Sequence, residues 1–119
     1  MSLSAKAPWL AFYGDMPKTI DYPRLTMYQL LARNAKAYPD LPAYEFQNRK
    51  TSFRSFLERI ERAAGALYAL GIRKGDRVTI CMPNTPQAQA CVYALTRLGA
   101  VSTMIHPVAA VGEITFYVD

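Results

Sequence analysis

The sequence predicts an α/β fold in which helices cover a partial parallel sheet. Two apolar strands, expected at residues 77–82 and 101–105, flank one amphipathic helix that Thr85 and Pro86 introduce. A strand, a crossover helix and a second strand in this order are typical of a right-handed βαβ unit with parallel strands. A further amphipathic helix, expected to begin at Phe53, precedes this unit and can cover the sheet.

The chain is expected to divide into an extended N-terminal arm, residues 1–25, and an α/β subdomain, residues 26–119. Proline, glycine and aromatic residues are frequent in the arm, and no helix or strand periodicity persists there. The aromatic side chains indicate that the arm packs against its own domain or against a partner. The subdomain is interpreted as a truncated part of a larger domain, because its last predicted helix, over residues 112–119, is cut short.

The first helix is expected to begin at Thr26, a residue suited to cap its free backbone N–H groups, and to end at Pro39. A short aromatic strand is expected over residues 43–47, followed by a turn over residues 48–50 into Thr51.

The second helix has the clearest amphipathic pattern in the chain, with Ser52 as its cap. Gly71 is suited to the left-handed residue that follows a helix, so this helix is expected to stop near Leu70. Three aromatic residues around its start are assigned to the core rather than to a substrate cage: Tyr44, Phe46 and Phe53.

The strand over residues 77–82 alternates aliphatic residues with Thr79 and Cys81 and carries no charge after Arg77. Such strands are usually buried on both faces, as in parallel sheets, and the strand over residues 101–105 is expected to be buried too. Gly99 is expected to end the helix between them. Its apolar face is expected to comprise Ala88, Cys91, Val92, Leu95 and Leu98.

Two cysteines, Cys81 and Cys91, are interpreted as small buried core residues without a disulfide. With no CxxC motif and one histidine, the sequence does not predict a zinc site. The start of the chain lacks the pattern of a secretory signal, and no apolar run approaches the roughly 20 residues of a membrane span. We therefore expect a cytoplasmic location and no transmembrane segment.

The net charge of +5 does not form a basic stripe, because the lysines and arginines are scattered. The densest group, Arg54, Arg59 and Arg62, is interleaved with Glu58 and Glu61 on the second helix. This pattern predicts a solvated face with local ion pairs, and nucleic-acid binding is not expected.

The turn over residues 83–86 lacks the glycines of a phosphate-binding loop. Either the Thr85 hydroxyl and the helix N-terminus hold an anion, or Thr85 only caps the helix, and we favour the cap. His106 follows the second strand at the edge where open α/β sheets place ligands. Because no carboxylate or nucleophile is its neighbour in the sequence, a supporting role for His106 is favoured over a catalytic one.

Four sequence blocks, at residues 50–57, 71–78, 82–87 and 98–117, carry a family resemblance. They read KTSFRSFL, GIRKGDRV, MPNTPQ and LGAV…HP…EI…Y. In order and spacing they resemble blocks of the adenylate-forming (AMP-binding) superfamily. The proline-rich and aromatic segment over residues 8–23 looks like the start of bacterial long-chain fatty acid–CoA ligases, so the resemblance covers nearly the whole chain.

The chain departs from the family pattern at two positions. Ser55 stands where the family often has an acidic residue, so the start of the second helix is expected to lack a complete capping box. His106 stands where the family usually has asparagine before proline.

The resemblance implies that the chain is the N-terminal part of an acyl-CoA synthetase that uses ATP, Mg²⁺ and coenzyme A. Such an enzyme converts a carboxylic acid to an acyl-adenylate, releases pyrophosphate and passes the acyl group to the thiol of coenzyme A. The family's phosphate loop, magnesium-binding glutamate, ribose-binding aspartate and C-terminal lysine lie beyond residue 119. We therefore expect an inactive scaffold with no catalytic, cofactor-binding or metal-binding residue of its own.

The expected partner is the rest of the parent enzyme. An alternative is an independent binding or oligomerisation module without enzymatic activity, which pairs with a second copy through the arm or an open sheet edge. A third possibility, a small flavodoxin-like nucleotide binder, finds no support in the loop sequence.

Overall fold

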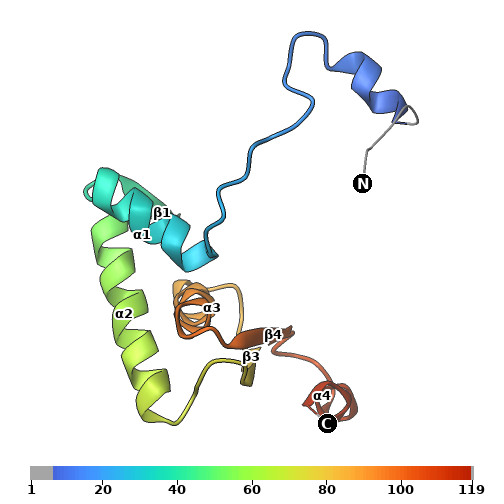
Figure 1. Ribbon diagram of the computed structural model, residues 1–119. Coiled ribbons are helices and arrows are strands. Elements are labelled where there is room, and N and C mark those ends of the chain that lie inside the picture. Colours follow the sequence, from blue (N-terminus) through green and yellow to red (C-terminus); the bar gives the residue numbers. More distant parts are fainter. Residues whose placement is uncertain (1–6, 119) are drawn as a thin grey trace.

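The computed structural model describes residues 7–118, and Figure 1 shows its elements in chain order. They are η1 (Pro8–Phe12), α1 (Met27–Ala37), β1 (Pro42–Phe46), β2 (Arg49–Ser52), α2 (Phe53–Ala69), β3 (Arg77–Cys81), α3 (Pro86–Leu98), β4 (Val101–Ile105) and α4 (Val111–Val118). No described helix has the length and apolar character needed to cross a membrane.

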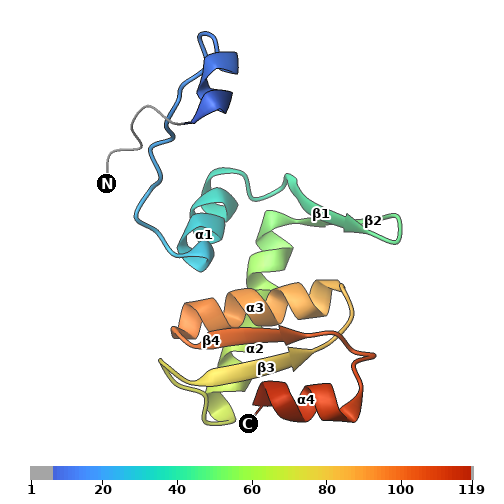
Figure 2. The ribbon, with the colours of Figure 1, turned by 90° about the vertical axis from the view of Figure 1, so that its right-hand side faces the viewer.

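The described strands form two separate two-stranded sheets. Strands β3 and β4 are parallel, with Arg77 opposite Val101 and Cys81 opposite Ile105, and α3 connects them. Figure 2 shows α3 lying along these two strands. The predicted βαβ unit and the α/β class are therefore confirmed.

The other sheet, β1 and β2, is an antiparallel hairpin, whereas the sequence predicts a single strand and a turn over residues 48–50. The two turn residues are instead Gln47 and Asn48, with φ of 49° and 60°. Two consecutive residues with positive φ make the turn that matches the twist of a hairpin. Arg49 is consequently the first residue of β2, opposite Phe46, and the prediction of a turn through residue 50 is wrong.

Helix α1 begins as predicted. The Thr26 side chain accepts a hydrogen bond from the backbone N–H of Gln29 at 3.2 Å, and the Gln29 side chain accepts one from the backbone N–H of Thr26 at 2.8 Å. This reciprocal pair is a complete capping box. The helix ends at Ala37, two residues before Pro39, because a proline disfavours helical geometry in the residue that precedes it.

Helix α2 has the predicted cap at each end. The Ser52 side chain accepts a hydrogen bond from the backbone N–H of Ser55 at 3.3 Å, without the reciprocal bond of a capping box. At the other end Gly71 has a φ of +99°, and the N–H of Ile72 donates to the carbonyl of Leu67 at 3.1 Å. This bond belongs to a Schellman motif, which satisfies carbonyls that the helix end leaves free.

The main core lies between α2 and α3. Ile60 and Ala64 of α2 and Ala94 of α3 are fully buried there, and Ala90 is nearly so. Ala90 and Ala94 are absent from the predicted apolar face. Their small side chains allow α3 to approach α2 closely, so this helix uses two faces, one for α2 and one for the strands.

The strand side of α3 forms a smaller second cluster. Ile80 of β3 packs there with Ala88 and Leu95 of α3, both of which are on the predicted apolar face. Figure 2 shows this side of α3 facing the sheet.

The parallel strands are not buried on both faces, so that prediction is wrong. Ile80 and Ile105 are their only buried residues, and Arg77 and Thr79 are exposed. Burial on both faces needs a layer on each side, and α3 is the one described helix that packs closely on both strands.

Two further burial assignments need correction. Cys81 is exposed rather than buried, whereas Cys91 is half-buried and packs against the second cluster; both thiols are free, as expected. Phe46 is 37% exposed, because it lies at the end of β1 in the hairpin rather than against α2. Tyr44 packs as predicted, with its ring edge-on to Phe56 at 5.1 Å between centroids.

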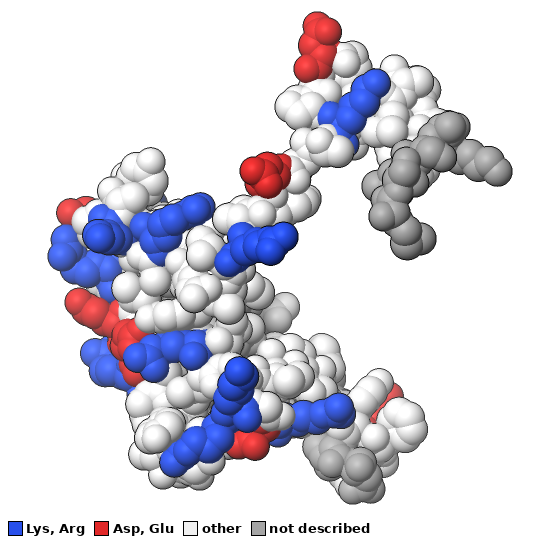
Figure 3. Space-filling model, in the orientation of Figure 1, with Lys and Arg blue, Asp and Glu red and all other residues white. Residues whose placement is uncertain are grey.

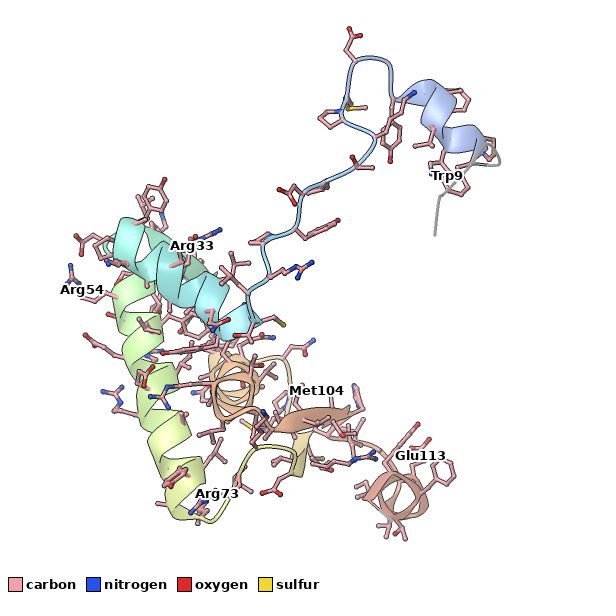
Figure 4. The ribbon with its side chains drawn as sticks, in the orientation of Figure 1. Trp9, Arg33, Arg54, Arg73, Met104 and Glu113 are labelled. Atoms are coloured by element: carbon pink, nitrogen blue, oxygen red, sulfur yellow. The ribbon has the colours of Figure 1, made fainter. Side chains whose placement is uncertain are left out.

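The arm runs away from the helices and strands, with Trp9 near its far end (Figure 4). It contains the short 3₁₀ helix η1, where the sequence predicts no element. Trp9 is 59% and Phe12 85% exposed, so the described part of the chain does not cover these rings. The radius of gyration of 18.4 Å exceeds the roughly 13 Å of a compact domain of this length for the same reason.

The α2–α3 contact predicts the effect of enlarging a buried alanine. Ala94→Leu adds three carbon atoms where no space exists, so we expect a loss of about 1–3 kcal/mol in the free energy of unfolding. Ala66→Leu, on the exposed side of α2, is the matched control and should change stability by less than about 0.5 kcal/mol. Urea unfolding followed by circular dichroism measures both, and equal effects would contradict this packing.

Two glycines predict opposite effects of the same substitution. Gly99 has a φ of +73°, and a Cβ there would lie 3.0 Å from Cγ of Lys74, so Gly99→Ala should destabilise by about 1–2 kcal/mol. Gly65 lies inside α2 with no atom within 4 Å of an added Cβ, so Gly65→Ala should stabilise by about 0.5–1 kcal/mol. Thermal unfolding checks both signs, and a stabilising Gly99→Ala would refute the left-handed geometry.

Candidate functional site

The carboxyl ends of β3 and β4 meet at one edge of the parallel sheet, where open α/β sheets commonly bind ligands. Two depressions open there and share Asn84. The first, of about 330 Å³, lies between the hairpin and the start of α3, and the second, of about 360 Å³, lies between the turns that follow β3 and β4. The second depression is lined by Met82, Pro83, Asn84, Met104, Ile105, His106 and Pro107.

Thr85 acts in this structure as a helix cap. Its Oγ1 accepts a hydrogen bond from the backbone N–H of Ala88 at 3.4 Å, and its backbone is extended as a capping residue requires. No lysine or arginine lines either depression at this edge. The geometry therefore favours the cap over the anion site, as the sequence analysis does.

His106 is exposed and holds the turn after β4. Its Nδ1 accepts the backbone N–H of Val108 at 3.4 Å, and its carbonyl accepts the backbone N–H of Ala109 at 3.0 Å. None of the residues that line its depression is a carboxylate or a nucleophile. The histidine is thus placed to support the turn, which agrees with the role favoured from the sequence.

The described residues do not fit the groups that the family resemblance implies. No three His, Cys, Asp or Glu side chains within residues 7–118 come together as a candidate metal site. The turn between β3 and α3 has no glycine through which backbone N–H groups could cradle phosphates. The expectation that the chain carries no catalytic, cofactor-binding or metal-binding residue stays a prediction.

A polar bridge joins three helices. Glu61 of α2 accepts hydrogen bonds from the hydroxyl of Tyr28 in α1 and from Nε of Arg97 in α3. The Arg97 Nε lies 2.8 Å from Oε2 and 2.9 Å from Oε1 of Glu61, and the guanidinium carbon lies 5.7 Å from the centre of the Tyr28 ring. We call these three residues the helix bridge.

The sequence pattern predicts local ion pairs on α2, and this detail is wrong. Glu61 pairs with Arg97, 36 residues away, and Arg54 pairs with Asp40 at 3.0 Å. Each pair joins α2 to another segment. No spacing rule along a helix could have identified them, because the partners meet only after the chain has folded.

The helix bridge shifts the pKa values of two of its members. The hydrogen bond to Glu61 is the main cause that raises the pKa of Tyr28 above its usual value of 10.0, and partial burial adds to it. The pKa of Arg97 is raised as well, first by its hydrogen bond with Tyr28 and then by that with Glu61. These shifts mark a structural clamp rather than a reactive group, because neither side chain changes charge near neutral pH.

Comparison with known proteins identifies a family and sequence relatives. The family described as "AMP-binding enzyme" matches residues 31–119. A long-chain-fatty-acid–CoA ligase of Bacillus subtilis (strain 168) is 30% identical over 115 residues, which cover 96% of this chain and 20% of the relative. Acetyl-coenzyme A synthetase 2 of Zygosaccharomyces bailii is 33% identical over 98 residues, covering 77% of this chain and 14% of the relative.

Solved structures share the fold. The N-terminal domain of FACL13 from Mycobacterium tuberculosis, with an inhibitor bound, superposes with a TM-score of 0.73 and 32% identity. The superposition covers 77% of this chain and 24% of that domain. In the sequence alignments, the chain spans a fifth or less of the length of the two relatives named above.

The raised pKa of Tyr28 predicts a loss of stability in alkali. The neutral phenol donates to Glu61 in the folded state, so the stabilisation should be constant below the unfolded pKa of 10.0 and fall as the pH rises through the higher folded pKa. Tyr28→Phe should lower the free energy of unfolding by about 1 kcal/mol at pH 8, and the difference from wild type should shrink above pH 10.

Urea unfolding of both proteins between pH 7 and 11 measures this difference. Subtracting the unfolding free energy of Tyr28→Phe from that of the wild type removes the contributions that the two proteins share. A difference that grows with pH would contradict the hydrogen bond as described.

Proposed function

Because this chain belongs to the family of AMP-binding enzymes, we propose that it forms the N-terminal part of a fatty acid–CoA ligase. The observation that carries this proposal is the alignment with the Bacillus subtilis long-chain ligase, which covers 96% of the chain and so includes most of the arm. The alignment with the acetyl-coenzyme A synthetase covers only 77%. The arm thus favours a long-chain substrate over acetate.

In this proposal the whole enzyme activates a carboxylic acid with ATP and Mg²⁺. The acid replaces pyrophosphate on the nucleotide to give an acyl-adenylate, and the thiol of coenzyme A then displaces AMP to give the thioester. The carboxyl group needs such activation because its own oxygen is a poor leaving group. The described residues contribute no group to these steps.

The contribution of this chain is a scaffold. Helix α3 holds the parallel strands on one side and α2 on the other, and the sheet edges of β3 and β4 stay open for further strands. A parallel sheet is stable when both faces are covered, so the rest of the enzyme is the natural partner of this sheet. The free thiols of Cys81 and Cys91 support a cytoplasmic location.

Self-association is a second candidate function. The exposed rings of the arm and the open edges of β3 and β4 favour it, because unpaired edges and uncovered apolar side chains promote pairing between chains. Size-exclusion chromatography with light scattering tests this second function. A self-associating module should have the mass of a dimer, whereas a scaffold without this function should have the mass of a monomer.

The parent activity is tested with a chimera in which residues 7–118 replace the matching segment of the Bacillus subtilis ligase. We expect fatty-acid-dependent release of pyrophosphate, because the family's ATP-binding groups remain in the host. The isolated chain, given ATP, Mg²⁺ and a panel of fatty acids, should release none.

The control is the same chimera with Ala94→Leu, which should lose activity in parallel with its stability. Turnover by the isolated chain would overturn the scaffold role. A chimera that folds, as judged by its thermal unfolding, but forms no acyl-adenylate would overturn the assignment to a ligase of this kind.

A further inference from the structure

A groove lined by arginines runs between α2 and the first turn of α3 and ends at the hairpin. It consists of two adjoining depressions of about 540 and 580 Å³, which share Arg59, Pro86 and Gln87. Figure 2 shows the hairpin near the N-terminal end of α3, with α2 passing behind α3. We call this feature the arginine groove. Its lining residues include Arg49, Arg59, Arg62, Tyr44, Pro86 and Gln87.

The charge of the arginine groove is uncompensated. Three arginines line it, and no aspartate or glutamate does. Within residues 7–118 the ion pairs are Arg54 with Asp40 and Arg97 with Glu61, so the three groove arginines take part in none. Glu58 has the helical spacing to pair with Arg62 but makes no ion pair with it.

Glu61, the other acid on this part of α2, is occupied by the helix bridge. Figure 3 shows Lys and Arg side chains with Asp and Glu side chains among them on the side of the molecule where α2 lies. The groove therefore keeps its positive charge in the folded chain.

One of these arginines is held in position by a neutral group. Nη1 of Arg59 donates a hydrogen bond to the hydroxyl of Tyr44 at 2.9 Å. The Tyr44 ring is itself packed edge-on against Phe56. A phenol positions the guanidinium without cancelling its charge, which reduces the entropy that Arg59 would lose on binding an anion.

The start of α3 adds to the positive electrostatic potential of the groove. Pro86, its first residue, and Gln87 line both depressions, and the N-terminal end of a helix carries a partial positive charge. Guanidinium groups bind phosphate oxygens with paired hydrogen bonds, which an ammonium group does not.

We propose that the arginine groove binds a phosphate-bearing ligand through Arg49, Arg59 and Arg62, with Tyr44 as a positioning residue. This site adjoins the first depression at the carboxyl edge, with which it shares Tyr44, Phe46 and Pro86, but its arginines do not line that depression. Phosphate binding there is additional to the proposed ligase reaction. The phosphate belongs either to a soluble phosphate ester or to a lipid headgroup, and the two sources share the same recognition chemistry.

The test uses residues 1–119 with two probes, inorganic pyrophosphate and vesicles of phosphatidylcholine with phosphatidic acid. Arg59→Gln combined with Arg62→Gln should weaken binding about tenfold or more, because each removes a charge-assisted hydrogen bond. Arg33→Gln combined with Lys36→Gln, on the exposed surface of α1 (Figure 4), removes the same net charge outside the groove and should leave binding within about twofold.

Tyr44→Phe keeps every charge and should weaken binding about threefold, through the lost contact to Arg59. Titration calorimetry measures pyrophosphate and sedimentation measures vesicles, and the probe that binds identifies the source. Thermal unfolding of each variant shows that the fold is retained. Binding of neither probe by the wild type, or equal losses in the groove and α1 variants, would overturn the proposal.

Discussion

The close packing of α2 against α3 is the contact on which the other elements depend. Ile60 and Ala64 meet Ala90 and Ala94 there, and three of these four side chains are completely buried. Helix α3 carries both parallel strands on its opposite side, and α2 carries the hairpin at its N-terminal end. Any change that separates the two helices therefore separates the sheet from the rest of the chain.

Polar groups reinforce this contact at its margin. The helix bridge joins α1 to the pair through one carboxylate, which satisfies a phenol and a guanidinium at once. Because Glu61 is committed there, the arginines on the neighbouring turn of α2 face solvent without a carboxylate partner. One structural interaction thus determines where the surface retains positive charge.

In the described part of the chain, the carboxyl edge of the open sheet carries residues with structural roles. The carboxyl edge of β3 and β4 is where ligands bind in folds of this type, but the residues there cap a helix and hold a turn. Family membership therefore rests on the match over residues 31–119, on the order of the sequence blocks and on the shared fold.

The sequence by itself determined the features that depend on residues a few positions apart. Helix caps at Thr26, Ser52 and Thr85 and the left-handed glycines Gly71 and Gly99 were all predictable, because each satisfies backbone groups of its own turn. The βαβ unit followed from the same local signals.

Burial and pairing were decided only by the tertiary structure. Cys81 and Phe46 are exposed although their types suggest a core. Cys81 lies on a strand that the described helices cover on one side only, and Phe46 lies at the end of β1 in the hairpin. Glu61 meets Arg97 across 36 residues for a similar reason, since their distance depends on how α2 and α3 pack. Such contacts are set by the arrangement of whole elements, which no short window of sequence contains.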